Sequence, residues 1–182
     1  DNVAIGDSAL DAVTTGSDNT AVGDNAGGAI TTGNENIAIG SSALLVATTA
    51  SNNVAVGTSA LQANTSGTDN VAVGDRAGTA ITTGSNNTLI GDVSGTALTT
   101  GASNTAIGAN SFQANTTGEQ NTALGKQALE SATTSSYNTA VGGSAGAATT
   151  TGANNVFVGY VAGTANTTGA SNTAVGANAL DA

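Results

Sequence analysis

The chain has no cysteine, histidine, proline, methionine or tryptophan, and only two phenylalanines and two tyrosines. Its 26 glycines without any proline exclude a collagen helix. Serine and threonine are common, but no histidine or cysteine is present to activate a hydroxyl or to act as the nucleophile, and Lys126 stands alone. We therefore expect neither enzyme activity nor a cofactor. Without cysteine, the sequence gives no sign of the redox compartment.

Positive charge is equally scarce, since Lys126 and Arg76 stand against 12 acidic residues and give a formal net charge of −10. Such a charge repels nucleic-acid phosphates and anionic membrane surfaces. No apolar run approaches the ~20 residues that span a bilayer, and no signal-peptide pattern is present. The sequence thus predicts no nucleic-acid partner and no membrane insertion by this segment, and any export signal or anchor is expected outside it.

Large apolar side chains are also few, because the 38% of hydrophobic residues are mostly alanine and valine. A globular core normally uses larger side chains, and a composition this poor in them suggests disorder. The apolar residues are, however, placed at regular intervals. This regularity favours an ordered repeat protein over a disordered chain.

The whole chain, residues 1–182, is one array of 17-residue repeats without insertions. Each copy begins with an asparagine, carries an aliphatic residue at position 4 and a glycine at position 5, and follows the pattern N-[TV]-A-[VI]-G-x-x-A-[LG]-x-A-x-T-T-G-x-x. We predict a single repeat-array domain. The copies begin at Asn2, Asn19, Asn36, Asn53, Asn70, Asn87, Asn104, Asn121, Asn138, Asn155 and Asn172.

A fixed short period of this kind predicts a solenoid in which each coil stacks on its neighbours. Helical coils are excluded, because threonine, valine, glycine and asparagine disfavour helix interiors and 17 residues cannot hold two helices with their turns. We expect an all-β solenoid of about eleven coils, each with two short strands, one on the "TAVG" segment and one around "AxTT". Glycine, asparagine and aspartate are expected at the corners.

Identical positions then lie about 4.8 Å apart in neighbouring coils and form ladders along a rod roughly 50 Å long. Structural ladders are expected from the asparagine, glycine and aliphatic positions. Alternation along the strand leads us to place the aliphatic residues of position 4 inside and the position 3 alanines outside, as a face covered by other chains. The residues that represent these predictions are Asn87, Asn104, Gly91, Gly108, Ile90 and Ile107 for the ladders, and Ala72, Leu89, Ala106 and Phe157 for the oligomer face.

Positions 9 and 12 suggest an exchange of side-chain volume. Position 9 is leucine or phenylalanine in some copies and glycine in others, and the glycine copies sometimes enlarge position 12, as at Ile30, Ile81 and Leu98. Thr149 and Asn166 break this pattern. The exchange is therefore a hypothesis, which requires side chains such as Leu61 and Ile81 to share one core space.

The "NTAVG", "NVAVG" and "NIAIG" segments, followed by "xxA", resemble the head repeats of trimeric autotransporter adhesins. The longer phrase "NTAIGANSFQANTTGEQ" at residues 104–120 is similar to repeats of phage tail fibres and bacterial surface proteins. The resemblance implies a left-handed parallel β-roll, three chains side by side, and display outside a cell or on a virion. The repeat here is longer than the usual autotransporter one, and the chain contains no neck, coiled-coil stalk, anchor or tail chaperone.

Two further groups of residues have chemical potential. Asp7 with Asp24, and Asp75 with Asp92, share one repeat position on adjacent coils and are weak candidates for a hard cation such as calcium, although we favour a solvated acidic corner. The unbroken threonines of position 13 form an alternative ice-binding ladder, represented by Thr82, Thr99 and Thr116. The simpler interpretation is that threonine is a good strand former whose hydroxyl caps a corner.

These observations lead us to predict a non-enzymatic, extracellular fibre segment that acts as an adhesive head or shaft on a cell or virion surface. Its expected partners are copies of itself, side by side as a homotrimer or end to end in a fibre, and an unknown surface receptor or matrix. The alternatives are an ice-binding solenoid and a purely structural spacer.

Overall fold

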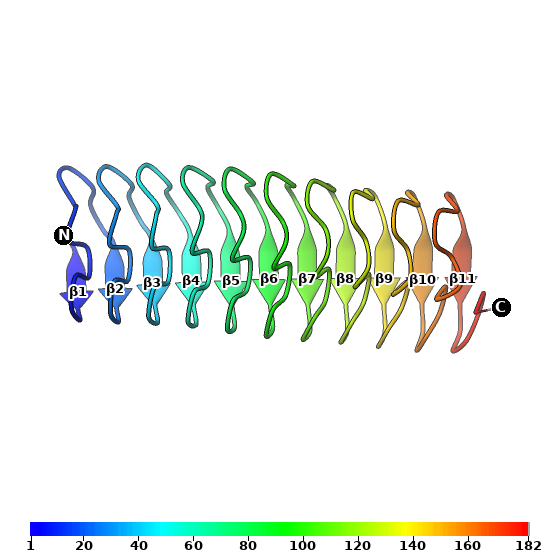
Figure 1. Cartoon of the computed structure of the whole chain (residues 1–182). Helices are drawn as coiled ribbons and strands as arrows, with labels where there is room; N and C mark the ends of the chain where they lie inside the picture. The colour runs from blue at the N-terminus through cyan, green and yellow to red at the C-terminus, as the bar shows by residue number, and fades with distance from the viewer. Residues whose placement is uncertain (182) are drawn as a thin grey trace.

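The computed structural model describes residues 1–181 as one continuous parallel β-solenoid, with one strand in each of eleven coils (Figure 1). Neighbouring strands pair in parallel with an offset of one repeat, so that Thr88 lies beside Thr105 and Ile90 beside Ile107. The described residues contain no helix that could cross a membrane. The strands are β1 (Val3–Ile5), β2 (Thr20–Val22), β3 (Ile37–Ile39), β4 (Val54–Val56), β5 (Val71–Val73), β6 (Thr88–Ile90), β7 (Thr105–Ile107), β8 (Thr122–Leu124), β9 (Thr139–Val141), β10 (Val156–Val158) and β11 (Thr173–Val175).

The expected second strand around "AxTT" is absent from the described coils, where this segment is bent. Its backbone still bonds to the next coil, but the pattern is not that of a β-ladder. The amides of Thr14, Thr15 and Gly16 all donate to the carbonyl of Thr31, at 3.0, 3.2 and 3.1 Å. Three donors that converge on one acceptor cannot alternate as a parallel ladder requires, so the segment stacks without forming a strand.

The glycine at position 5 ends each strand with a turn that no other residue makes easily. Gly108 has a φ of 136°, and a β-carbon built on it lies 2.5 Å from the carbonyl carbon and oxygen of Gly125 in the next coil. A side chain there is opposed both by the backbone conformation and by the stacked coil. This glycine therefore permits a close approach between neighbouring coils.

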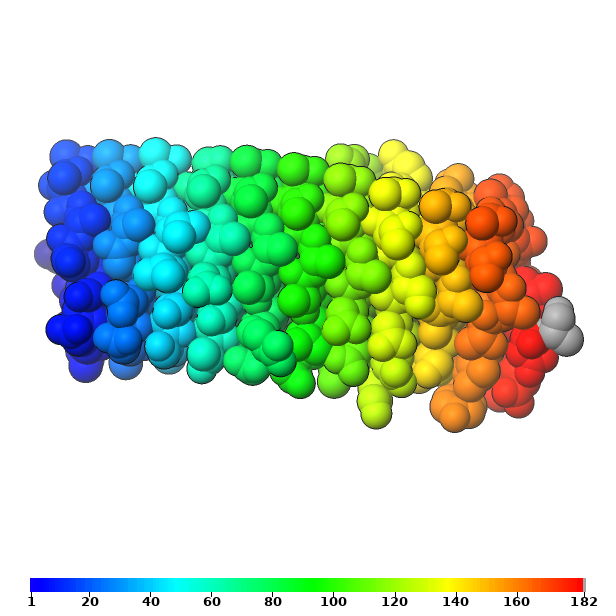
Figure 2. Space-filling view, viewed as in Figure 1, coloured from blue at the N-terminus to red at the C-terminus, as the bar shows by residue number. Residues whose placement is uncertain are grey.

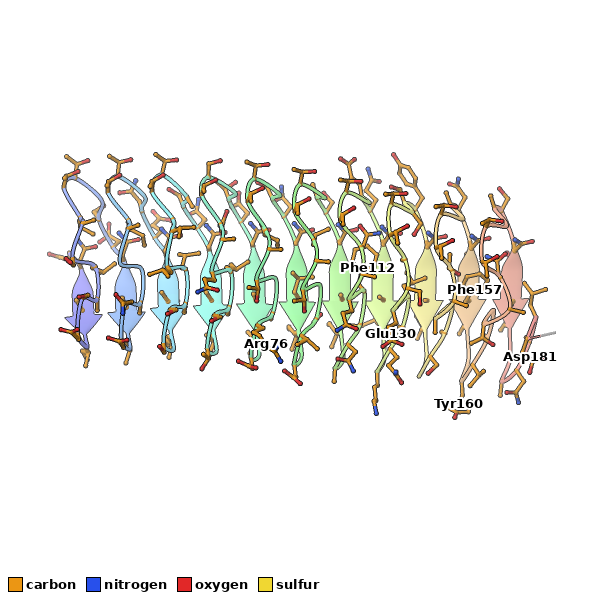
Figure 3. All side chains as sticks on the ribbon, in the orientation of Figure 1. Arg76, Phe112, Glu130, Phe157, Tyr160 and Asp181 are labelled. Carbon is orange, nitrogen blue, oxygen red and sulfur yellow. The ribbon has the colours of Figure 1, made fainter. Side chains whose placement is uncertain are left out.

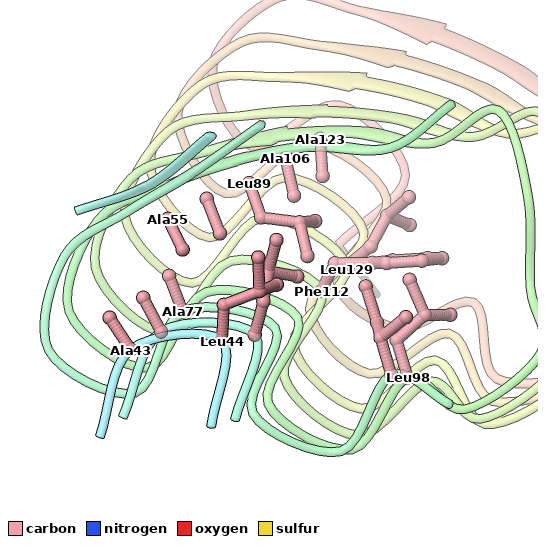
Figure 4. Close-up of a cluster of buried hydrophobic side chains, with 14 of the residues drawn as sticks. Ala43, Leu44, Ala55, Ala77, Leu89, Leu98, Ala106, Phe112, Ala123 and Leu129 are labelled. Atoms are coloured by element: carbon pink, nitrogen blue, oxygen red, sulfur yellow. The ribbon is translucent and has the colours of Figure 1, made fainter. Parts of the chain in front are cut away.

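The interior is a narrow core that runs the length of the rod and is built mostly from alanine and leucine (Figure 4). Position 3 points into it, and Ala21, Ala55 and Ala123 are completely buried. Positions 8, 9 and 12 supply its other walls, with residues such as Ala43, Leu44 and Leu98. The phenyl rings of Phe112 and Phe157 lie within the coils (Figure 3).

The core confirms that Leu61 and Ile81 point into one space. A β-carbon added to Gly78 lies 3.0 Å from Cδ2 of Leu61, 3.3 Å from Cδ1 of Ile81 and 2.8 Å from Cδ1 of Leu89. Glycine at position 9 thus leaves room that side chains from its own and neighbouring coils fill. Because protein interiors are close-packed, the loss of volume at one position must be matched by a gain at another.

Leu89 and Phe157, the two large residues at position 3, take part in the same exchange. A β-carbon on Gly95 meets Cδ2 of Leu89 at 2.8 Å, and one on Gly146 meets Cδ2 of Phe157 at 2.7 Å. The phenyl ring of Phe157 also occupies the space beside Gly163. A single ring therefore fills the gap left by two glycines, which explains why their coils need no large residue at position 12.

The first prediction concerns the close approach of neighbouring coils at Gly108. Replacing Gly108 with alanine should lower the free energy of unfolding by about 3 kcal/mol or more, because it adds a disfavoured backbone conformation to a collision with Gly125. Thermal and denaturant unfolding measure the change. Gly143→Ala is the matched control, since its β-carbon meets only the Tyr160 ring at 3.5 Å. Equal stability of the two variants would contradict this account of the stacking.

The second prediction concerns the exchange of core volume. Phe157→Ala should cost about 3–5 kcal/mol, since it opens a cavity beside two glycines. Gly146→Leu should also destabilise the native chain, because its side chain meets the Phe157 ring. In the Phe157→Ala background the same Gly146→Leu change should stabilise the protein. Leu44 and Leu61 show that two neighbouring coils can both carry a buried leucine at position 9. A double-mutant cycle in urea measures the coupling, and additive effects would disprove the exchange.

Candidate functional site

The most extensive candidate surface is the outer side of the eleven-stranded sheet, which we call the strand face and define as the side chains of positions 2 and 4 in β1–β11. Position 4 is aliphatic in every coil, and position 2 is threonine, valine or isoleucine. Ile39 is 39% exposed and Ile107 is 36% exposed, unusual values for isoleucines within a continuous sheet. The strand face is therefore an apolar band along the rod, which Figure 2 shows as an elongated stack of coils with side chains projecting from its lower edge toward the C-terminal end.

This arrangement reverses the predicted orientation of the strands. Ala72, Leu89, Ala106 and Phe157, expected on an outward oligomer face, are all fully buried inside their own chain. Ile107, expected inside, lies at the surface, and Ile90 is only partly covered. The reason is the width of the coil: the space behind the strand admits mainly alanine, and glycine at position 9 is needed wherever position 3 is larger. The prediction that the position 3 residues form an oligomer face is wrong.

Charge is excluded from the strand face. Positions 1 to 5 carry no charged residue in any coil, so the acidic side chains that give the net charge of −10 lie elsewhere on the coil. Figure 3 shows Arg76, Glu130 and Tyr160 projecting from one edge of the rod, away from the strands. A second copy can thus approach the strand face without facing carboxylates there.

The asparagines of position 1 form a buried hydrogen-bonded ladder at the start of each strand. The Asn104 side chain is 1% exposed, and its Nδ2 donates to Asn87 Oδ1 at 3.1 Å and to the Gly118 carbonyl at 2.9 Å. Its Oδ1 accepts from the backbone amide and from Nδ2 of Asn121, each at 3.0 Å. Each amide group thus joins its own coil to both neighbours, and it has no capacity left for a ligand.

Two adjacent rows of hydroxyls run along the rod. We call the row at position 13 the inner Thr rank and the row at position 14 the outer Thr rank. Thr82, Thr99 and Thr116 belong to the inner rank and are half-buried. Their hydroxyls donate to the backbone carbonyl of the next inner-rank threonine, at 3.3, 2.9 and 3.1 Å. The outer rank, whose members were not among the ice-binding candidates named from the sequence, is exposed in every described coil. The sequence signal that marks it is a nearly constant threonine, replaced only at Ser66.

The four candidate metal-binding aspartates lie on the exposed corner after each strand. Asp7 and Asp92 are exposed, the Asp24 carboxylate accepts from Asn25 at 3.0 Å, and that of Asp75 accepts from Arg76 at 3.1 Å. In residues 1–181, no three histidine, cysteine or acidic residues come together as a metal site. The surroundings of these carboxylates are those of a solvated acidic corner.

Comparison with protein-family models, with curated proteins and with solved structures finds no match for this chain in any of the three.

The third prediction concerns the asparagine ladder. Asn104→Leu should cost about 3 kcal/mol or more, because it leaves the Asn121 amides and the Gly118 carbonyl buried without partners. Asn34→Leu is the control, since Asn34 is exposed and its Oδ1 accepts from the Ser17 amide at the surface, where water can replace it. We expect the control to cost about 1 kcal/mol or less. Similar unfolding midpoints for the two variants would refute the structural role of the ladder.

Proposed function

We propose that this chain is a non-enzymatic segment of an extracellular fibre, displayed on a cell or virion surface as an adhesive head or shaft. The observation that carries the proposal is the uncharged aliphatic strand face on a straight rod. The sequence resemblance to adhesin heads and tail-fibre repeats supports the same assignment and implies three copies side by side.

The strand face has the chemistry expected of an interface between copies. Large exposed apolar bands on soluble proteins usually mark association sites. From strand geometry, the face measures about 10 Å by 50 Å, or about 500 Å² per copy. A pair of copies then buries about 1,000 Å², the lower limit for a specific contact, and side chains that flank the strands add to it. The position of the acidic residues outside positions 1 to 5 also favours association of like-charged chains.

The remaining surface favours an adhesive role over that of a uniform spacer. Position 6, on the corner that follows each strand, holds seven residue types along the array, including Lys126 and Tyr160. Tyr160 is 66% exposed and Tyr137, at position 17, is 52% exposed. Exposed aromatic rings are common anchors in recognition surfaces. A rod that buries its strand face between copies leaves these varied corners available to a receptor or matrix.

The fourth prediction tests the association. Native mass spectrometry and sedimentation equilibrium at micromolar concentration should find an oligomer, with three copies expected. The double change Ile90→Lys and Ile107→Lys should convert it to monomers, because it places charge in the centre of the strand face. The control, Thr100→Lys with Thr117→Lys, adds the same charge to the outer Thr rank of the same region and should leave the oligomer intact. A monomeric native chain, or an oligomer that tolerates the isoleucine changes, would overturn the proposal.

A further inference from the structure

The outer Thr rank is constant where other exposed positions vary. Of its ten members, nine are threonine and one is Ser66, and all ten side chains are exposed. Over the same coils the exposed position 17 uses six residue types, from Asp18 to Tyr137. Solvent exposure alone thus allows wide variation in this array. The constancy of the outer rank requires a separate cause.

Hydrogen bonding within the protein accounts for the inner rank but not for the outer one. From Thr14 to Thr150, each inner hydroxyl is tied to the next coil, as from Thr99 to Thr116. Among the described residues, the hydrogen bonds of the outer rank use its backbone, as when the amide of Thr100 donates to the Thr116 carbonyl at 3.4 Å. Other residues can make such a backbone bond. The outer hydroxyls are therefore invariant without serving the fold.

We propose that the outer Thr rank, supported by the inner rank, is an ice-binding site. The ranks place hydroxyl and methyl groups in straight rows with a repeat of about 4.8 Å, close to the spacing of water oxygens along a row in ice. The bonds of the inner hydroxyls to the next coil hold these rows in register. Because such a row is already rigid, little conformational entropy is lost when it binds an ordered water lattice.

The surroundings of the two ranks favour ice over other periodic ligands. Positions 12 to 15 contain no charged residue in any coil, so no strongly hydrated group interrupts the rows. The same positions contain no aromatic residue on which a sugar ring could stack, which disfavours a crystalline polysaccharide. Each outer hydroxyl is free both to donate and to accept, as a water lattice requires.

The ranks are also separate in sequence and chemistry from the strand face. Positions 13 and 14 belong to the bent segment of each coil, whereas the strand face uses positions 2 and 4. Ice binding therefore does not depend on the proposed association of copies. The Ile90→Lys, Ile107→Lys variant should retain it, so that failure of one proposal leaves the other standing.

The fifth prediction is that the native chain shapes ice crystals, shows thermal hysteresis and, when fluorescently labelled, partitions into a growing ice shell. The triple change Thr83→Lys, Thr100→Lys and Thr117→Lys should reduce all three effects to the level of a protein without ice affinity. The control places three lysines on the exposed position 17 of the same three repeats, as Asn86→Lys, Ser103→Lys and Gln120→Lys, and should retain full activity. Circular dichroism melting checks that both variants remain folded.

Three outcomes would overturn the proposal: a native chain without ice shaping or ice partition, equal activity in the two folded triple variants, or binding to cellulose or chitin powder without any effect on ice. If the rank variant fails to fold, Thr100→Val with Thr117→Val replaces it. That change keeps the side-chain shape and removes two hydroxyls, and it should still reduce thermal hysteresis by at least half.

Discussion

The contacts that join the coils of this rod depend on the constant length of the coil. The asparagine amides and the inner threonine hydroxyls bond to the residue 17 positions away, and the strands pair in register with the same offset. One inserted residue would move a buried asparagine away from its partner and place a side chain where Gly108 meets Gly125. Because each coil contacts only its neighbours, such a fault could not be compensated elsewhere. The absence of any insertion in the array follows from this constraint.

The narrow core is the second consequence of so short a coil. Only a thin space remains between the strand and the turn segment. Alanine therefore fills position 3 in most coils, and the larger Leu89 and Phe157 lie beside glycines of position 9. Phe157 is accommodated because Gly146 and Gly163 have no side chain in the space that its ring occupies. The individual coils are therefore matched to their neighbours even though their consensus is the same. A rod assembled from these coils in another order would contain both cavities and collisions.

The sequence predicted the features that depend on period and missed those that depend on volume. The 17-residue spacing was sufficient to predict parallel coils and an all-β solenoid. Which face of the strand is buried was not predictable from alternation, because alternation allows either face to be buried and favours the larger Ile107 over Ala106 as a core residue. The structure places Ala106 inside because of the limited width of the coil. The second strand was missed for a related reason: the Thr–Thr segment has strand-forming residues, but its amides converge on one carbonyl.

The same geometry gives the rod surfaces of different character without any change of fold. Threonine at position 13 is needed internally, because its hydroxyl carries a coil-to-coil bond, and threonine at position 14 is not. The side chain at position 4 lies outside because position 3 of the same strand faces the thin interior. Stacking of the coils then repeats the outward aliphatic residues of position 4 in a row along the rod. An uncharged band suited to a flat, regular partner is therefore a physical consequence of building a solenoid from a 17-residue repeat with alanine inside.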